Sequence, residues 1–236
     1  MNTGFYKDLD TNFELACKMS EQEFSHEEFL NLLQNGNIPE KQIAALKISK
    51  IQNLEEAKIL VNNLTGCDGK VREAVALKIN QLLNESDFYP KLFAQLDYIP
   101  FANATIDING NICRLVIDSV SILKQDKAFS KAYLNQILSF TRETFVELDK
   151  FIFRDKKYVI NKQLFKLYWC LDALKCFTDE LDFKEILPIL ERASKEKEYT
   201  IREKVAQILV LTNDNTLNEL KAKLTQDENY YVRAVF

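Results

Sequence analysis

One segment of the chain, residues 150–177, combines basic and aromatic side chains in a way that could bind nucleic acid. Within residues 150–166 one acidic residue, Asp155, accompanies six basic ones: Lys150, Arg154, Lys156, Lys157, Lys162 and Lys166. The interleaved aromatic residues are Phe151, Phe153, Tyr158, Phe165, Tyr168 and Trp169. Basic groups neutralise phosphates and aromatic rings stack on bases. A structural interpretation is favoured, because at helical spacing the aromatic residues would form an inward face and the lysines a solvated one.

Residues for catalysis are scarce. The only histidine, His26, stands beside two glutamates at the predicted start of a helix, where a solvated surface residue is favoured over a general base. A nucleophilic triad would need this histidine, and no nucleophile motif accompanies it. The sequence TGCDGK, residues 65–70, lacks the spacing of a phosphate-binding loop. We therefore expect no enzymatic activity, no catalytic residue and no cofactor.

The cysteines favour neither a disulfide framework nor a zinc site, because they are odd in number and contain no CxxC pair. They are Cys17, Cys67, Cys113, Cys170 and Cys176. Buried thiols in a reducing compartment are the better expectation. The sequence begins without the basic and apolar regions of a signal peptide, and it has no run of 18 apolar residues. We expect a cytoplasmic protein without a metal site or a membrane span.

The composition favours an all-helical protein. The 236 residues include only five glycines and four prolines, which is too few for many tight hairpins. The net charge is −4, so no overall basic field would attract nucleic acid or an anionic membrane. The acidity belongs to the first half: residues 1–118 hold 11 Lys/Arg and 17 Asp/Glu, whereas residues 119–236 hold 20 and 18.

One eleven-residue pattern of the sequence, the repeat pattern (or phrase), occurs more than once. GKVREAVALKI (69–79) returns 130 positions later as YTIREKVAQIL (199–209), and Val232-Arg233 follows Ile201-Arg202 by 31 residues. Near the beginning, Ala45-Leu46-Lys47-Ile48 precedes a matching Ala-Leu-Lys-Ile by the same 31 residues. A fixed offset at both ends of a chain indicates structural repeats.

The repeats are predicted to be helix pairs. Four capping patterns, a capping side chain three residues before a glutamate, mark the first helices: they begin at Ser25, Asn53, Asp182 and Thr216. The recurring phrase marks the second helices, which are expected at about 39–51, 69–84, 109–124, 158–178 and 199–212, with a stub at 229–236. The second helices are apolar on more than one side, which suits packing against neighbours on most sides.

These patterns resemble HEAT repeats. The resemblance rests on Pro-x-Leu in the first helix, at Pro90 and Pro188, and on an acid four residues before an arginine ahead of an Ala-rich second helix. It implies an all-α right-handed solenoid of about five to six antiparallel helix pairs over residues 25–236, preceded by a helical cap over 1–24. The middle, about 87–178, departs from the pattern: IPFANATIDINGN is an insertion, and Asn161 replaces the arginine. The last repeat is truncated.

The resemblance also implies a structural ladder, in which the turn acid and the arginine hydrogen-bond within and between repeats. Its members here would be Asp68, Arg72, Glu198, Arg202 and Arg233, with Lys41 as a weaker candidate. Related superhelices of the armadillo and tetratricopeptide kinds stay open.

A HEAT-like array would expose a concave face lined by its second helices, suited to binding another protein. The residues expected to bind a partner there are Lys47, Lys78, Asp118, Lys166, Trp169 and Gln207. The prediction is a non-enzymatic scaffold or adaptor for an unidentified protein, with possible self-association through the C-terminal repeat. The alternative is a nucleic-acid-binding protein using residues 150–172, where Tyr168-Trp169 and Asp172 resemble the aromatic cleft and carboxylate of HEAT-like alkylpurine DNA glycosylases. HEAT-like phycobilin lyases are a less favoured comparison, since no residue points to a chromophore.

Overall fold

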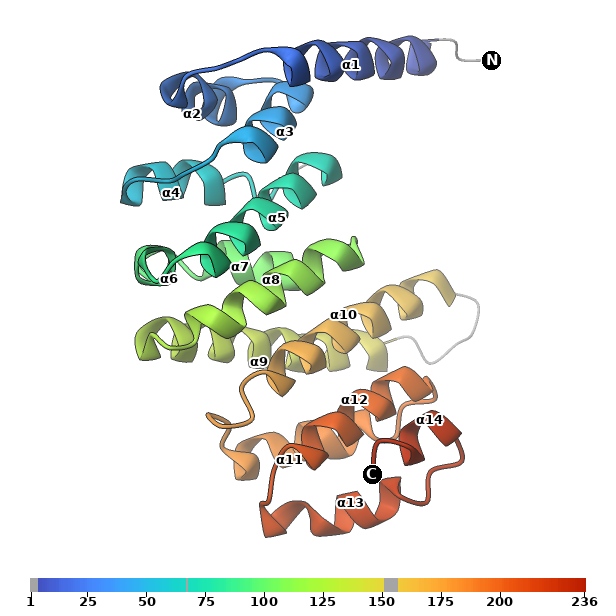
Figure 1. Ribbon diagram of the computed structural model, residues 1–236. Helices are drawn as coiled ribbons and strands as arrows, with labels where there is room; N and C mark the ends of the chain where they lie inside the picture. The colour runs from blue at the N-terminus through green and yellow to red at the C-terminus, as the bar shows by residue number, and fades with distance from the viewer. Residues whose placement is uncertain (1–3, 67, 151–156) are drawn as a thin grey trace. The chain divides into compact units, whose positions relative to one another are not determined.

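The computed structural model describes the backbone of residues 4–66, 68–150 and 157–236, and side chains within 11–66, 68–150 and 161–236 (Figure 1). These residues form helices and one short 3-10 helix, with no strand in the described ranges. The predicted all-α class is confirmed for them. Several residues of the basic–aromatic segment, Phe151, Phe153, Arg154, Asp155 and Lys156, lie outside the described residues, as do Cys67 and the side chains of Lys157 and Tyr158.

The chain divides into two compact units, unit 1 (Met1–Phe129) and unit 2 (Ser130–Phe236). Unit 1 is acidic, with 13 Lys/Arg and 18 Asp/Glu, whereas unit 2 has 18 and 17. The helices of unit 1 are α1 (Gly4–Glu21), α2 (His26–Asn35), α3 (Ile38–Lys47), α4 (Leu54–Val61), α5 (Gly69–Glu85), α6 (Phe88–Phe93), α7 (Ile99–Thr105) and α8 (Gly110–Leu123).

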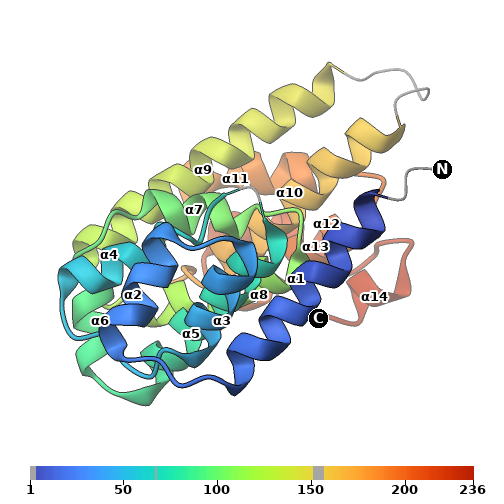
Figure 2. The same cartoon turned by 90° about the horizontal axis from the view of Figure 1, so that it is seen from above.

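Unit 1 is built from two rows of helices. The helices α1, α3, α5 and α8 pack one against the next, and α2, α4 and α6 pack in the same way. Figure 2 shows the second row on one side of α3, α5 and α8. The core lies between the rows, where Ala44, Ala45 and Val75 are fully buried. Small side chains at these positions let the helices approach closely, as the apolar pattern of the second helices predicts.

Local capping explains where several of these helices begin. At α2 the Ser25 hydroxyl accepts the Glu28 amide and the Glu28 carboxylate accepts the Ser25 amide, which confirms the predicted capping box. Asn37 and Glu40 form a second box at α3, where proline stands in the first turn. Asp68 caps α5 by accepting the amides of Lys70 and Val71.

Unit 2 contains α9 (Lys127–Asp149), which begins just before the boundary, then α10 (Lys157–Lys175), α11 (Phe183–Ala193), α12 (Tyr199–Val210), a 3-10 helix η2 (Asn215–Leu217), α13 (Asn218–Leu224) and α14 (Tyr230–Arg233). The central helix is α12, which packs against α10, α11, α13 and α14. Val205, Ala206, Ile208 and Leu209 of α12 are fully buried. The side chains that emerge between α10 and α12 are therefore held by the best-packed part of the unit.

The observed helices differ from the predicted ones in three places. The inserted IPFANATIDINGN contains a helix of its own, α7, followed by the turn into α8. Thr216, expected to cap the last first helix, lies inside η2, and Asp214 caps that turn instead by accepting the Thr216 amide. The second helices end two to four residues before the predicted ends in α3, α10 and α12.

The prediction that the chain has no membrane-spanning segment agrees with the helices that the structure describes. In the described part of the chain, no helix has both the length and the apolar character needed to cross a bilayer.

Candidate functional site

A group of interacting polar and aromatic side chains lies between α10 and α12. On α10 the partly exposed residues Phe165, Tyr168, Asp172 and Lys175 follow helical spacing, and on α12 Thr200, Glu203 and Gln207 do the same. We call this surface the α10–α12 face. It has two parts, a polar cluster and an adjoining pocket.

The Asp172 cluster consists of Asp172, Lys175, Lys204 and Gln207. Oδ1 of Asp172 accepts hydrogen bonds from Nζ of Lys204 at 2.6 Å and from Nζ of Lys175 at 2.8 Å. Oε1 of Gln207 accepts from the same two ammonium groups at 3.3 and 3.5 Å. Lys204 is 8% exposed, and its Nζ also lies 4.6 Å from the centre of the Tyr168 ring. The cluster therefore fixes the Tyr168 ring beside α12 through a cation–π contact.

Burial and pairing act in opposite directions on the Asp172 cluster. Burial raises the pKa of Asp172, but the hydrogen bonds from Lys175 and Lys204 outweigh it, and the pKa of this carboxyl lies below its usual value. Burial likewise lowers the pKa of Lys204, and its bond to Asp172 reverses the effect, so that this pKa lies above the usual value. Both groups stay charged around neutral pH, as a buried ion pair requires.

Acid should weaken this cluster. Because the folded-state pKa of Asp172 is depressed, its contribution to stability is present above the unfolded-state pKa of about 3.9 and is lost as the pH falls through the folded-state pKa. The Asp172→Asn variant lacks this carboxylate at every pH, so acid cannot remove its contribution a second time. The destabilisation caused by Asp172→Asn, measured by urea unfolding, is therefore expected to be full at pH 7 and to shrink below about pH 4. An equal loss at pH 3 and pH 7 would contradict the assignment.

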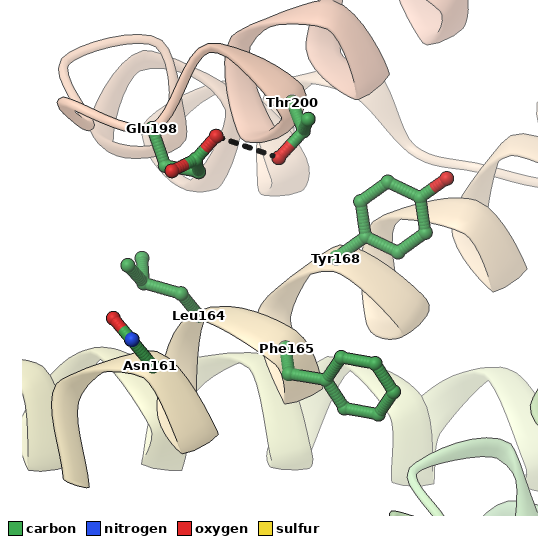
Figure 3. Close-up of a pocket in the computed structure, with 6 residues that line it drawn as sticks. All are labelled: Asn161, Leu164, Phe165, Tyr168, Glu198 and Thr200. Atoms are coloured by element: carbon green, nitrogen blue, oxygen red, sulfur yellow. Dashed lines mark hydrogen bonds between the residues drawn. The ribbon is translucent and has the colours of Figure 1, made fainter. Parts of the chain in front are cut away.

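The pocket adjoins the cluster on the side of the two helix N-termini. It has a volume of about 430 Å³ and is lined by Asn161, Leu164, Phe165, Tyr168, Glu198 and Thr200. Figure 3 shows Leu164 and Tyr168 rising from α10 toward α12, with Glu198 and Thr200 above them. Glu198 Oε1 accepts only a long bond, 3.3 Å, from the Thr200 hydroxyl. The pocket thus offers aromatic and aliphatic walls with one carboxylate and one amide.

The aromatic wall of this pocket is supported from below by Trp169. The Trp169 ring is 6% exposed and makes edge-to-face contacts with Phe165 and Tyr168, at centroid distances of 6.0 and 5.0 Å. Its buried Nε1 has no hydrogen-bond partner among the described residues. Trp169 was expected to contact a partner. The structure places its ring in the interior instead, beneath Phe165 and Tyr168.

The other predicted partner-binding residues have varied surroundings. Lys47 donates to the carbonyls of Ser20 and Gln22 at the end of α1, at 2.9 and 2.6 Å, so its ammonium is already used within unit 1. Lys78 is half-buried on α5, and burial lowers its pKa more than the nearby charge of Glu85 raises it. Asp118 is exposed on α8 and Lys166 is half-buried on α10, whereas Gln207 belongs to the Asp172 cluster. The three predicted residues of unit 1 lie on the consecutively packed helices α3, α5 and α8, and the three of unit 2 lie on the packed pair α10 and α12.

The ladder arginines make one recurring set of contacts. Nε and Nη2 of Arg72 donate to the two carboxylate oxygens of Asp107 at 2.6 and 3.1 Å, while Nη1 donates to the Gly66 carbonyl. Arg202 grips Asp227 in the same two-pronged way at 2.8 and 3.0 Å, and its Nη1 donates to the carbonyls of Glu196 and Lys197. Each arginine therefore ties its own preceding turn to the turn before the next second helix.

The acids of the ladder are not the ones predicted from the sequence. Asp68 caps its own helix, and Glu198 accepts its one hydrogen bond among the described side chains from the Thr200 hydroxyl. The bound acids, Asp107 and Asp227, each stand two residues before an asparagine N-cap. The recurring Asp-x-Asn pattern is the signal that could have identified them. Lys41, the weaker candidate, donates to the Asn63 side chain at 3.1 Å.

Two expectations about reactive side chains are changed by the structure. His26 is half-buried rather than solvated, because its Nε2 lies 2.9 Å from a carboxylate oxygen of Glu56. Among the described cysteines, Cys113 and Cys170 are buried as expected, whereas Cys17 is exposed. Burial raises the pKa of the Cys170 thiol to about 12, which makes it unreactive.

The α10–α12 face presents aromatic rings, a pocket and paired charged side chains. No set of three His, Cys, Asp or Glu side chains in the described ranges could hold a metal ion. Compared with protein-family models and with curated proteins, the chain gives no match to either.

Proposed function

We propose that the chain is a HEAT-like α-solenoid of antiparallel helix pairs that acts as a scaffold or adaptor and binds a partner protein on the exposed face of its second helices. The sequential packing of α3, α5 and α8 in unit 1, and of α10, α12 and α14 in unit 2, supports such an array. So does the recurrence of the arginine contacts, because a repeated contact indicates a repeated structural unit.

The observation that carries the binding proposal is the pre-positioned aromatic surface of the α10–α12 face. Phe165 is 37% exposed, and Tyr168 is held between Lys204 and Trp169. Aromatic side chains fixed before binding lose little conformational entropy on association, and such residues dominate protein–protein interfaces. The pocket beside them can accept one side chain of the partner, with the polar cluster as the rim.

Capture from native extract tests this proposal. Phe165→Ala should reduce recovery of the bound protein at least about tenfold, which corresponds to 1.4 kcal/mol. Lys166→Glu and Lys78→Glu should show whether charge on α10 and α5 contributes. The matched control is Phe88→Ala, since Phe88 is 49% exposed on α6, in the other row of unit 1. Equal losses in the Phe165 and Phe88 variants would contradict a specific α10–α12 face.

The same experiment separates the nucleic-acid alternative. The described part of α10 carries basic and aromatic side chains on its accessible surface, namely Lys162, Phe165 and Lys166. If capture disappears on nuclease treatment, the nucleic-acid hypothesis replaces the adaptor proposal. Capture that survives nuclease and is lost with Phe165→Ala is the expected result.

A further inference from the structure

Three arginines occupy the same position in their second helices, and two of them share one set of guanidinium contacts, to which Arg202 adds bonds to the Lys197 carbonyl and to Glu228. Arg72 and Arg202 each direct Nη1 to a carbonyl six residues earlier and grip an aspartate with Nε and Nη2. The side chains in both pairs are about 90% buried or more. Such two-pronged arginine–carboxylate contacts are geometrically specific.

Arg233 makes only the first half of this set. Its Nη1 donates to the carbonyls of Asp227 and Glu228, six and five residues earlier, as in Arg202. Its Nε and Nη2 have no partner among the described residues, and the side chain is exposed. The backbone contacts hold the guanidinium in the orientation that grips a carboxylate in the other two cases. The two free donors are therefore pre-positioned for an acid that the described residues do not supply.

The surface around Arg233 is aromatic. Tyr230, Tyr231 and Phe236 are 67%, 60% and 44% exposed, and the Tyr231 ring stacks on Tyr199 of α12 at 5.8 Å. The neighbouring acid, Asp227, is already held by Arg202. An incoming carboxylate would thus meet an unsatisfied guanidinium within a rim of aromatic rings, a combination typical of strong interface residues.

From these contacts we propose that Arg233 and the exposed rings of α14 dock a partner polypeptide through an aspartate that stands two residues before the N-cap of a helix. This is the chemistry that Asp107 presents to Arg72 and that Asp227 presents to Arg202. The surface does not depend on the function proposed for the α10–α12 face.

A second copy of the chain is a poor source of that aspartate. The positions two residues before the N-caps of α3, α5, α8, α12 and α14 hold Asn35, Gly66, Asp107, Glu196 and Asp227. The first two are not acidic, and Asp107 and Asp227 are occupied. At the same offset before α2 and α6 the chain has Glu23 and Glu85, which are exposed but carry a side chain one methylene longer than that of aspartate. Glu196 is partly buried and lies 3.9 Å from Arg192 of its own unit. A partner of different sequence therefore fits the open position better.

A synthetic peptide with the sequence of residues 214–231 is a suitable probe, because it carries α13 and the Asp227 turn that Arg202 recognises. Titrated into the full chain, it should produce a saturable shift of the Arg233 Nε–H signal in a ¹⁵N NMR spectrum. The peptide with Asp227→Asn should bind about three- to fivefold more weakly, because it lacks the contribution of an exposed ion pair. The two peptides should bind equally to the Arg233→Gln chain, which lacks the charge and the two-pronged geometry.

Two results would overturn the proposal: no shift of the Arg233 signal up to about 5 mM peptide, or equal affinity of the aspartate and asparagine peptides for the unaltered chain. Concentration-dependent dimerisation lost in Arg233→Lys would assign the surface to a second copy instead.

A second measurement supplies the carboxylate from the same chain. Repeating residues 206–236 after Phe236 places a copy of Asp227 at the same spacing from Arg233 that separates Arg202 from Asp227. The melting midpoint should then fall when the copied aspartate is changed to asparagine, and this difference should vanish with Arg233→Gln.

Discussion

Replacing Arg202 by methionine is expected to lower the free energy of unfolding of unit 2 by about 3–5 kcal/mol, the usual cost of removing one partner of a buried ion pair. The Arg202 and Asp227 side chains are both 8% exposed. Removal of the guanidinium leaves a buried carboxylate without its cation and two turn carbonyls without their donor. The hydrophobic gain from the methionine side chain is smaller than this loss.

Urea unfolding followed by the fluorescence of Trp169 measures this effect, because the chain's only tryptophan is buried in unit 2. The matched control is Arg233→Met, at the same position of α14, where no carboxylate of the described residues is bound and the loss should stay within about 0.5 kcal/mol. The double variant Arg202→Met with Asp227→Asn should lose less than the sum of the two single changes, since the orphaned charge is gone. Similar losses for Arg202→Met and Arg233→Met would mean that the ladder contributes little to stability.

Asp227 adds a pH signature to this comparison. The hydrogen bond from Arg202 is the largest influence on its carboxyl and holds its pKa below the usual value despite the burial. The stabilising contribution is therefore present above about pH 4 and is lost as the pH falls through the folded-state pKa. The loss in Arg202→Met should accordingly be smaller in acid than at neutral pH.

Helix positions were largely predictable from the sequence because they depend on local signals. The Ser25 capping pattern and the 31-residue offset located helices whose limits differ from the observed ones by a few residues. The extra helix α7 was missed, since its short apolar segment lacks a capping side chain at Tyr98. Local patterns could also identify Arg72 and Arg202 as special, because the phrase around them repeats.

Partners across helices were less predictable, because sequence spacing does not reveal them. Arg202 binds an acid 25 residues later and Arg72 one 35 residues later, whereas the predicted acids stood four residues before each arginine. The Asp172 cluster was missed for a related reason. Lys204 stands where the matching phrase has Ala74, an inward position, and this lysine in an apolar position was the available sign of a buried polar contact.

The second large effect is expected at that cluster: Asp172→Asn should lower the free energy of unfolding of unit 2 by about 2–3 kcal/mol at pH 7. The substitution keeps the shape but removes the charge that balances Lys204, whose side chain is 10% exposed. The matched control is Asp149→Asn, because Asp149 is 61% exposed in its ion pair with Arg192, and such surface pairs contribute at most about 1 kcal/mol. Equal losses in the two variants would contradict a buried, organising role for the cluster.

Adding Lys204→Met to Asp172→Asn should restore part of the lost stability, because the unpaired ammonium is removed from its buried position. It should not restore binding of the partner, since the Tyr168 ring then lacks the cation that holds it beside α12. Stability and binding would thus separate in one pair of variants. Full recovery of both would mean that the Asp172 cluster supports the packing of α10 on α12 without positioning the aromatic side chains. The proposal that the α10–α12 face is pre-organised for a partner would then be wrong.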